Sequence, residues 1–439
     1  MKVDNSILIN NNSNTFKYKL LRYFKKQSFN KRRLRIDEGF QQPTKSSSRI
    51  HSSLMSSNQH KIDFLSYLPI ELSFIILSFC DKKTIFESSH VSKYWNSLCK
   101  DNHLWRELYL GHHGTIYPAT TSSSSINYRL LYERKLQLLN RWKGGYRTRM
   151  QTIVGHQDSI YCVQFDGSKI VTGSRDRTIK FWKMESDIVR CYKTLKGHVA
   201  SVLCLQYDHH LLVSGSSDNT ILVWCMKTFE IKRCLRGHSS GVLDVCFDNN
   251  VIASCSKDTT IQIWDRITGQ RIQTLIGHHG PVNAIQFKDN TLVSASGDAI
   301  IKLWNLKTGE CLRNFIGHSH GLACVGFDGK RIVSGGNDNK IKVWNADTGE
   351  CILTCEGHTG LVRSLYFDKD KIVSGSYDQS IKIWDMYTGE CIQTFNKCHK
   401  SWVFDVTFNE TKIISTSQDQ KILIIDFAHN MDTKHLIKV

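Results

Sequence analysis

The chain lacks the segments that place a protein in a membrane or direct it to secretion. Its 439 residues contain no apolar run of the roughly eighteen residues that a membrane-spanning helix needs. The N-terminal residues also lack the apolar core and small-residue cleavage site of a signal peptide. We therefore predict a protein of the cytoplasm, the nucleus or both, with no membrane partner.

The cysteine spacing that holds zinc is also absent. None of the 15 cysteines forms a Cys-x-x-Cys pair, so we predict no metal site and no cofactor. Cys311, Cys351 and Cys391 fall 40 residues apart, which places them at one position of a repeating unit. We expect them on the fourth strand of successive units, as small buried hydrophobic side chains.

Acidic residues are scarce relative to basic ones. The chain has 58 Lys and Arg against 40 Asp and Glu, for a formal net charge of +18. Half of this excess lies in the first 60 residues, which carry 12 basic and three acidic side chains and no sustained hydrophobic periodicity. Residues 1–61 therefore read as a disordered basic tail. Because half of the excess sits in this tail, nucleic-acid binding is the least favoured function.

The dominant feature is a pattern of about 40 residues that returns seven times between Gly155 and Asp426. Its clearest copy reads GHVASVLCLQYDHHLLVSGSSDNTILVW, from Gly197 to Trp224. Self-similarity at this period indicates stacked supersecondary units. Alternating apolar residues separated by Gly, Ser, Asn and Asp predict a four-stranded antiparallel sheet in each unit.

Each unit also repeats a set of polar residues. In the second unit these are His198, Ser214, Asp218 and Trp224, and in the seventh unit Ile425 takes the place of the Trp. Such residues can form a buried hydrogen-bonded chain, which is stable only when every member is paired. A Ser, a His and an Asp also resemble a hydrolytic triad. Because an active site is not normally built seven times in one domain, we predict a structural role and no catalysis.

The unit resembles the WD repeat, and seven such repeats imply a mainly β protein built on a seven-bladed β-propeller at residues 147–427. The seventh unit supplies only three strands of its own. We expect a strand at Arg147 to Val154 to complete it, because this pairing closes the ring and removes exposed edges. Residues 428–439 are left as a C-terminal tail.

A small helical region at residues 62–110 precedes the repeats. Pro69 is well placed at a helix start, and Leu72, Ile75 and Phe79 follow at helical spacing. We expect three short helices here. About fifty residues form a small core, so the region would gain stability by packing on a partner. Residues 111–146 read as a loop and then a helical linker that ends at Trp142.

This region resembles the F-box, whose hallmarks here are the opening LPIEL and the Ile76-Leu77 pair. In that family the motif binds a Skp-type adaptor, which docks to a cullin scaffold. The resemblance implies that the adaptor contacts Leu68, Pro69, Leu72, Ile76 and Leu77.

Two positions of each repeat are expected to face the rim where the central channel opens. The residues before the turn Asp form the first column, which is Arg175, Ser217, Lys257, Gly297, Asn337, Tyr377 and Gln418. The fifth residues after the His form the second column, which is Tyr161, Leu203, Leu243, Asn283, Ala323, Arg363 and Phe404. Neither column contains an acid. A rim of this composition favours a phosphorylated acidic peptide.

At these columns the chain resembles the beta-transducin-repeat-containing F-box proteins, substrate receptors of SCF ubiquitin ligases that bind a doubly phosphorylated Asp-Ser-Gly-x-x-Ser degron. The residues that match that family's binding rim are Tyr161, Arg175, Leu203, Ser217, Asn283, Gly297, Ala323, Arg363 and Tyr377. The resemblance implies that Arg175 and Tyr161 hold one phosphate and that Arg363 and Tyr377 contact the acidic part of the peptide.

The resemblance as a whole implies a non-catalytic subunit of an SCF-type E3 ligase that selects phosphorylated proteins for ubiquitination and proteasomal degradation. The alternative is a WD-repeat scaffold for signalling or RNA-processing complexes that has no ligase function.

Overall fold

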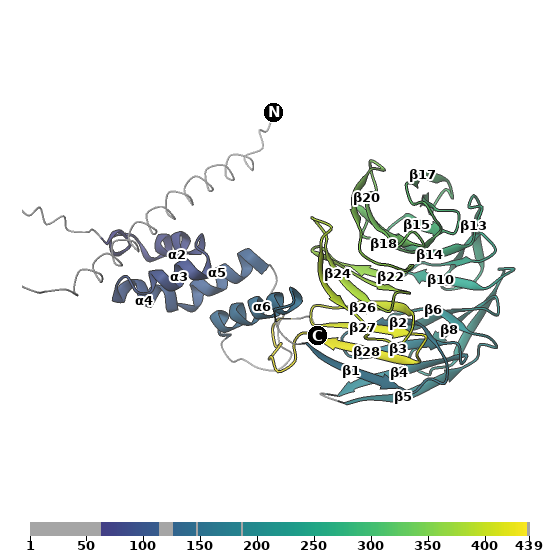
Figure 1. Cartoon of the computed structure of the whole chain (residues 1–439), viewed down its shortest axis with the longest axis horizontal. Coiled ribbons are helices and arrows are strands. Elements are labelled where there is room, and N and C mark those ends of the chain that lie inside the picture. Colours follow the sequence, from purple (N-terminus) through teal and green to yellow (C-terminus); the bar gives the residue numbers. More distant parts are fainter. Residues whose placement is uncertain (1–62, 114–125, 146–147, 186–187, 437–439) are drawn as a thin grey trace, which may run out of the picture. The chain divides into compact units, whose positions relative to one another are not determined.

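The computed structural model describes residues 63–113, 126–145, 148–185 and 188–436 (Figure 1). The predicted basic tail and most of the predicted loop after residue 111 lie outside these ranges. The described residues divide into two compact units. One contains the helices up to Leu136, together with Lys434–Leu436, and the other contains all the strands and runs from Gln137 to Thr433. This second unit begins before the predicted propeller boundary at residue 147.

The first unit contains more helices than the three expected. They are η1 (Phe64–Tyr67), α2 (Ile70–Ser78), α3 (Lys82–Ser88), α4 (Lys93–Lys100), α5 (Asn102–His113) and the first part of α6 (Tyr128–Trp142), the predicted linker. Side-chain caps mark two of the starts, because Asp81 accepts from the Thr84 N–H at 2.9 Å and Ser92 accepts from the Trp95 N–H at 3.2 Å. The additional helices are η1 and α5, and α5 carries Trp105 into the core, where its indole N–H donates to the Cys99 carbonyl.

The second unit is a ring of seven four-stranded antiparallel sheets, so the predicted mainly β fold with seven blades is confirmed (Figure 1). The first three blades, innermost strand first, are β2 (Ile160–Phe165), β3 (Lys169–Ser174), β4 (Thr178–Glu185), β5 (Ile188–Lys196); β6 (Val202–Tyr207), β7 (Leu211–Ser216), β8 (Thr220–Cys225), β9 (Ile231–Arg236); and β10 (Val242–Phe247), β11 (Val251–Ser256), β12 (Ile261–Asp265), β13 (Arg271–Leu275).

The remaining blades are β14 (Val282–Lys288), β15 (Thr291–Ser296), β16 (Ile300–Asn305), β17 (Cys311–Ile316); β18 (Leu322–Phe327), β19 (Arg331–Gly336), β20 (Ile341–Asn345), β21 (Cys351–Cys355); β22 (Val362–Phe367), β23 (Lys371–Ser376), β24 (Ile381–Asp385), β25 (Cys391–Phe395); and β26 (Val403–Phe408), β27 (Lys412–Ser417), β28 (Lys421–Asp426), β1 (Arg149–Val154).

The ring closes as the sequence predicts. Strand β1 pairs antiparallel with β28 from Arg149 opposite Asp426 to Val154 opposite Lys421. It therefore supplies the outer strand of the seventh blade, while β2, the next strand in the chain, begins the first blade. The inner strand β2 contacts both β6 and β26, so the inner strands form a continuous circle.

The hydrophobic core lies between neighbouring blades. One cluster joins Val171 and Phe181 of the first blade to Val202 and Trp224 of the second, and each of these side chains is buried. The end of the linker helix joins the core of the seventh blade. There the Trp142 ring stacks on Phe427 with centroids 3.9 Å apart. This packing explains why the second unit includes residues before 147.

The prediction of buried cysteines on the fourth strands is wrong in one respect. Cys311, Cys351 and Cys391 do begin the outer strands β17, β21 and β25, but all three are exposed. An outer strand has a neighbour on one side only, and in β17 Phe315 is the one buried residue. All 15 cysteines lie in the described ranges and are free thiols.

No helix in the described ranges is long and apolar enough to cross a membrane.

Candidate binding surfaces on the propeller and the F-box region

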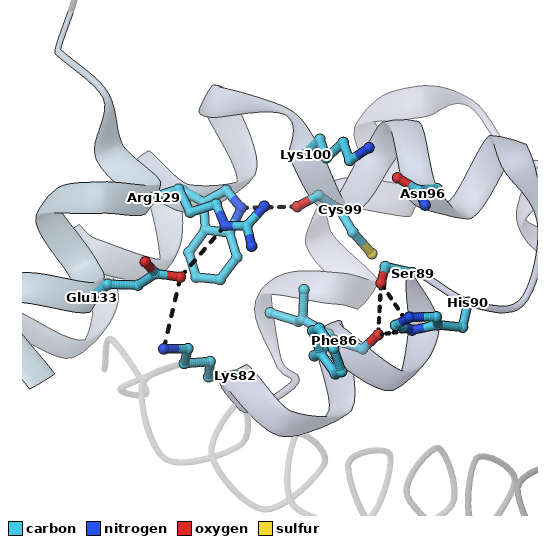
Figure 2. Close-up of a pocket in the computed structure, with 11 residues that line it drawn as sticks. Lys82, Phe86, Ser89, His90, Asn96, Cys99, Lys100, Arg129 and Glu133 are labelled. Atoms are coloured by element: carbon cyan, nitrogen blue, oxygen red, sulfur yellow. Dashed lines mark hydrogen bonds and ion pairs between the residues drawn. The ribbon is translucent and has the colours of Figure 1, made fainter.

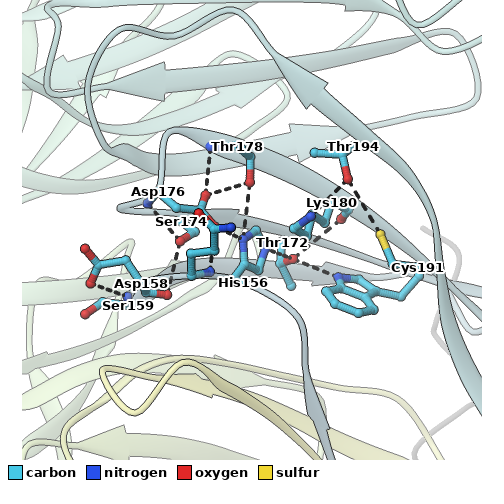
Figure 3. Close-up of polar contacts among 12 residues, drawn as sticks. His156, Asp158, Ser159, Thr172, Ser174, Asp176, Thr178, Lys180, Cys191 and Thr194 are labelled. Atoms are coloured by element: carbon cyan, nitrogen blue, oxygen red, sulfur yellow. Dashed lines mark hydrogen bonds and ion pairs between the residues drawn. The ribbon is translucent and has the colours of Figure 1, made fainter.

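The repeated polar residues form one connected chain inside the first blade (Figure 3). The Trp182 indole N–H donates to Thr172 Oγ1 at 2.9 Å, and Thr172 Oγ1 lies 2.8 Å from His156 Nε2. His156 Nδ1 lies 2.8 Å from Asp176 Oδ2. With the aspartate ionised, the imidazole donates from Nδ1 and accepts the threonine proton at Nε2, so every member is paired.

Hydrogen bonding keeps this aspartate charged. Burial alone would raise the pKa of Asp176, but bonds from His156, Thr178 and the backbone N–H of Gln157 outweigh it and hold the pKa below its usual range. The bonds of His to Asp and to the hydroxyl recur in all seven blades, including the last, where His399 lies 3.2 Å from Asp419 and 2.8 Å from Ser415. The Trp bond to the hydroxyl is made in the first six blades, because Ile425 replaces the Trp in the seventh.

The hydroxyl residues of these chains are fully buried. They are Thr172, Ser214, Ser254, Ser294, Ser334, Ser374 and Ser415, each with 0% exposure. A nucleophile must reach its substrate, so this placement supports the structural role.

A β-bulge places the second column of the rim. In the first blade the pairing of β2 with β3 passes from Ile160–Ser174 to Cys162–Gly173, so Tyr161 is the extra residue. The pairing skips the equivalent residue in each other blade, namely Leu203, Leu243, Asn283, Ala323, Arg363 and Phe404. A bulge redirects a side chain away from the regular alternation of the strand. All seven second-column residues are redirected in this way.

The first column lies beside the second in every blade. The Arg175 N–H donates to the Ser159 carbonyl at 2.8 Å, two residues before Tyr161. The Tyr377 N–H likewise donates to the Leu361 carbonyl at 2.9 Å, two residues before Arg363. The structure therefore brings together the residues that the sequence selects for the rim. First-column residues are exposed apart from the half-buried Tyr377, and second-column residues are half-buried or buried.

Acidic side chains lie close to the rim, although neither column contains one. Asp158 lies next to the first-column residue of the first blade, with its Oδ2 3.8 Å from Arg175 Nε. Both side chains are largely exposed, and an exposed ion pair contributes at most about 1 kcal/mol. Asp158 therefore holds the Arg175 guanidinium only weakly.

Two further acids, missed by the sequence analysis, lie one residue beyond the bulge on inner strands. Asp244 accepts the Ile285 N–H at 2.9 Å, and Asp405 accepts the Val163 N–H at 2.8 Å. Burial raises the pKa of Asp244 to about 7 and the pKa of Asp405 to about 6, and the Arg363 charge opposes both shifts. Arg363 itself donates from Nη1 to the Ala323 carbonyl at 3.3 Å.

The α2 region carries exposed apolar residues. Tyr67, Ile70, Leu72, Ile75 and Phe79 all lie at 45% exposure or more. Such a concentration on a small helical unit is typical of an interaction surface. Of the five predicted adaptor contacts, Pro69 and Leu72 are exposed, Leu68 and Ile76 are half-buried, and Leu77 is fully buried in the core.

A small cavity of about 220 Å³ lies among α3, α4, α5 and the start of α6 (Figure 2). Figure 2 shows Glu133 between two cations, and its carboxylate lies 3.7 Å from Lys82 and 3.5 Å from Arg129. The cavity is smaller than the roughly 300 Å³ at which ligand pockets begin, and these charges at its edge are already paired. In the described ranges no group of three or more His, Cys, Asp or Glu residues is arranged to hold a metal ion.

Comparison with known proteins matches both regions. The F-box-like family profile matches residues 65–111. The profile described as WD domain, G-beta repeat matches seven segments, which are residues 147–183, 189–225, 229–265, 269–305, 309–345, 349–385 and 389–426.

Several curated proteins are similar over part of the chain. F-box/WD repeat-containing protein 7 of Drosophila melanogaster is 31% identical over 160 residues, which cover 33% of this chain and 12% of that protein. The probable E3 ubiquitin ligase complex SCF subunit sconB of Arthroderma otae is 27% identical over 158 residues, which cover 29% of this chain and 23% of that protein. The matches therefore span less than a quarter of the length of these relatives.

A solved structure is similar over a larger part. The crystal structure of the computationally designed Ika8 protein has a TM-score of 0.54 and 33% sequence identity, with 62% of this chain and 85% of that chain covered.

Proposed function

Because the chain belongs to the WD-repeat family and carries an F-box-like region before its seven repeats, we propose that it is a substrate-recognition subunit of an SCF-type E3 ubiquitin ligase. The F-box region binds a Skp-type adaptor and, through it, a cullin scaffold. The propeller rim binds phosphorylated proteins, which are then ubiquitinated and degraded by the proteasome. A relative named as a probable SCF subunit supports the assembly.

The chain acts by proximity. It contributes no reacting group. It holds the target protein close to the ubiquitin-loaded enzyme, which raises the effective concentration of the target at that enzyme. The observation that carries the proposal is the presence in one chain of an exposed apolar F-box surface and a cationic propeller rim.

At the rim, Arg175 with Tyr161 holds one phosphate and Arg363 with Tyr377 holds the acidic part of the peptide. Arg175 is exposed and its pairing with Asp158 is weak, so its guanidinium is available. Arg363 donates one N–H to the Ala323 carbonyl, and its guanidinium has further N–H groups that can donate to an anion. Arginine binds phosphate by paired charge-assisted hydrogen bonds.

The other matched rim residues contact the uncharged part of the peptide. Asn283 donates its amide N–H to the Leu322 carbonyl at 2.6 Å, which leaves its amide oxygen to accept from a peptide N–H. Ser217 of the second blade and Gly297 of the fourth are exposed in the first column, while Leu203 and Ala323 give apolar contact in the second.

Fluorescence anisotropy of a labelled Asp-Ser-Gly-x-x-Ser peptide tests the rim. We expect the full chain to bind the doubly phosphorylated form and not the unphosphorylated form. Arg175→Ala and Arg363→Ala should each weaken binding at least about 10-fold, because a hydrogen bond to a charged group contributes about 1.5–3 kcal/mol. Lys307→Ala is the control, since it removes an exposed positive charge from the turn between β16 and β17.

Equal binding of both peptide forms, or loss of binding in the Lys307→Ala control as well, would contradict the phosphate site. The first result would favour a scaffold that assembles complexes without reading a phosphate.

A further inference from the structure

Four aromatic side chains gather on one sector of the rim, across the sixth, seventh and first blades. The Tyr377 ring stacks on Trp402 with centroids 4.6 Å apart and planes 7° from parallel. Phe404 meets Trp402 edge-on at 6.5 Å and Tyr377 edge-on at 5.9 Å. The Tyr161 ring also contacts Phe404, with ring centroids 4.9 Å apart.

This aromatic sector, consisting of Tyr161, Tyr377, Trp402 and Phe404, has a buried base and an open surface. Phe404 is 6% exposed and supports the other rings, whereas Trp402 is 44% exposed. A stack at 4.6 Å leaves no room for a guest between Tyr377 and Trp402. A guest side chain must therefore lie on the outer surface of the indole. Because the rings hold each other in place, little side-chain freedom is lost when a guest binds.

Positive charge stands on both sides of the sector. Arg363 is on the same blade as Tyr377, and Arg175 is on the same blade as Tyr161, in the adjoining rim positions. An apolar platform between two arginines complements a peptide that carries an apolar side chain near acidic or phosphorylated groups.

We propose that the aromatic sector is a specificity subsite that receives one planar apolar side chain of the phosphorylated substrate, an aromatic residue or a proline. Flat rings pack on an indole surface through offset or edge-to-face contacts, which add to the gain from burying apolar area. The arginines select for the anionic groups, and the sector selects among phosphorylated peptides. This inference rests on the proposed phosphopeptide function.

A positional scan tests the subsite. The parent probe is a labelled, doubly phosphorylated Asp-Ser-Gly-x-x-Ser peptide with Ala at its variable and flanking positions. A single Phe is then moved through these positions, one peptide at a time. We expect at least one Phe peptide to bind the full chain about 10-fold more tightly than the parent. Trp402→Ala should remove that gain and change the affinity for the all-Ala parent much less, through the lost support of Tyr377 alone.

This double-mutant comparison isolates the contact between the peptide ring and the indole. Trp402→Phe should restore part of the gain. The control is Tyr387→Ala, which removes an aromatic side chain of 68% exposure from the turn between β24 and β25 and should change nothing.

Two results would overturn the subsite. If the parent binds through Arg363 but no Phe position improves it, or if the gain survives in Trp402→Ala, the sector does not select the substrate and the phosphopeptide function stands. If neither the parent nor any Phe peptide binds, both proposals fall together.

Discussion

Replacing Asp244 by Asn should stabilise the propeller at pH 8 and give no gain near pH 4. Burial is the main reason that the pKa of Asp244 rises from 3.8 to about 7, and the nearby Asp405 charge adds to the rise. Backbone N–H donors from Ile285 and Val245 oppose the rise without cancelling it. The folded protein therefore holds a proton that the unfolded chain releases.

The sign and size follow from this difference in proton binding. Between pH 3.8 and about 7 the native state binds more protons than the unfolded state, so stability falls as the pH rises. The interval is about three units, and each unit corresponds to 1.36 kcal/mol, so the wild-type aspartate costs at most about 4 kcal/mol above pH 7. Asn carries no charge and keeps an oxygen for the Ile285 N–H, but it loses the acceptor for the Val245 N–H, so Asp244→Asn should recover about 2–4 kcal/mol rather than more.

Urea unfolding of wild type and Asp244→Asn at several values between pH 4 and pH 8 measures the difference directly. The gain in unfolding free energy should grow through this range and level off above pH 7. Asp347→Asn, which changes an exposed turn residue, is the matched control and should show no such trend. Parallel curves for wild type and Asp244→Asn would refute the reasoning, because they would mean that Asp244 ionises equally in both states.

Three further outcomes are expected. Ser294→Ala should cost about 2–4 kcal/mol in urea unfolding, because its hydroxyl bonds both a buried His and a buried Trp, whereas Ser415→Ala should cost less, since its blade has no Trp donor. Leu72→Glu should abolish co-purification with a Skp-type adaptor and leave the helical circular dichroism unchanged, whereas Leu77→Glu, at a fully buried position, should reduce the helical signal as well. Deleting residues 149–154 should expose the edge of β28 and give aggregated protein in size-exclusion chromatography.

The propeller was predictable because its signal is repeated. A single pattern of alternating residues leaves strand and helix ambiguous, but seven aligned copies establish the period and the sheet in each unit. The partners of each His, Ser, Asp and Trp followed from their constant spacing. Ring closure was predictable from the number of strands in each unit, because the last unit was one strand short and a strand-like segment preceded the first unit.

Burial was harder to predict, because it depends on neighbours that are distant in sequence. Cys311 occupies a regular repeat position, but its strand lies at the outside of a blade and is covered on one side only. Leu77 and Leu72 lie on the same helix and match the same motif, yet one points into the core and the other away from it. The burial of Asp244 was not predicted, because no sequence pattern in these repeats distinguishes a buried acid on an inner strand from an exposed one.

The bulges explain how one fold carries a variable rim. The residue before each bulge belongs to the strand pairing and is buried, and its seven occupants are all branched aliphatic side chains, namely Ile160, Val202, Val242, Val282, Leu322, Val362 and Val403. The bulged residue itself has no partner in the pairing, and its occupants range from alanine to arginine and phenylalanine. A side chain that is not part of the strand pairing can change without altering the hydrogen-bond ladder of the blade. Variation among repeats at this one position is therefore a signal of the bulged rim position that can be read from the sequence alone.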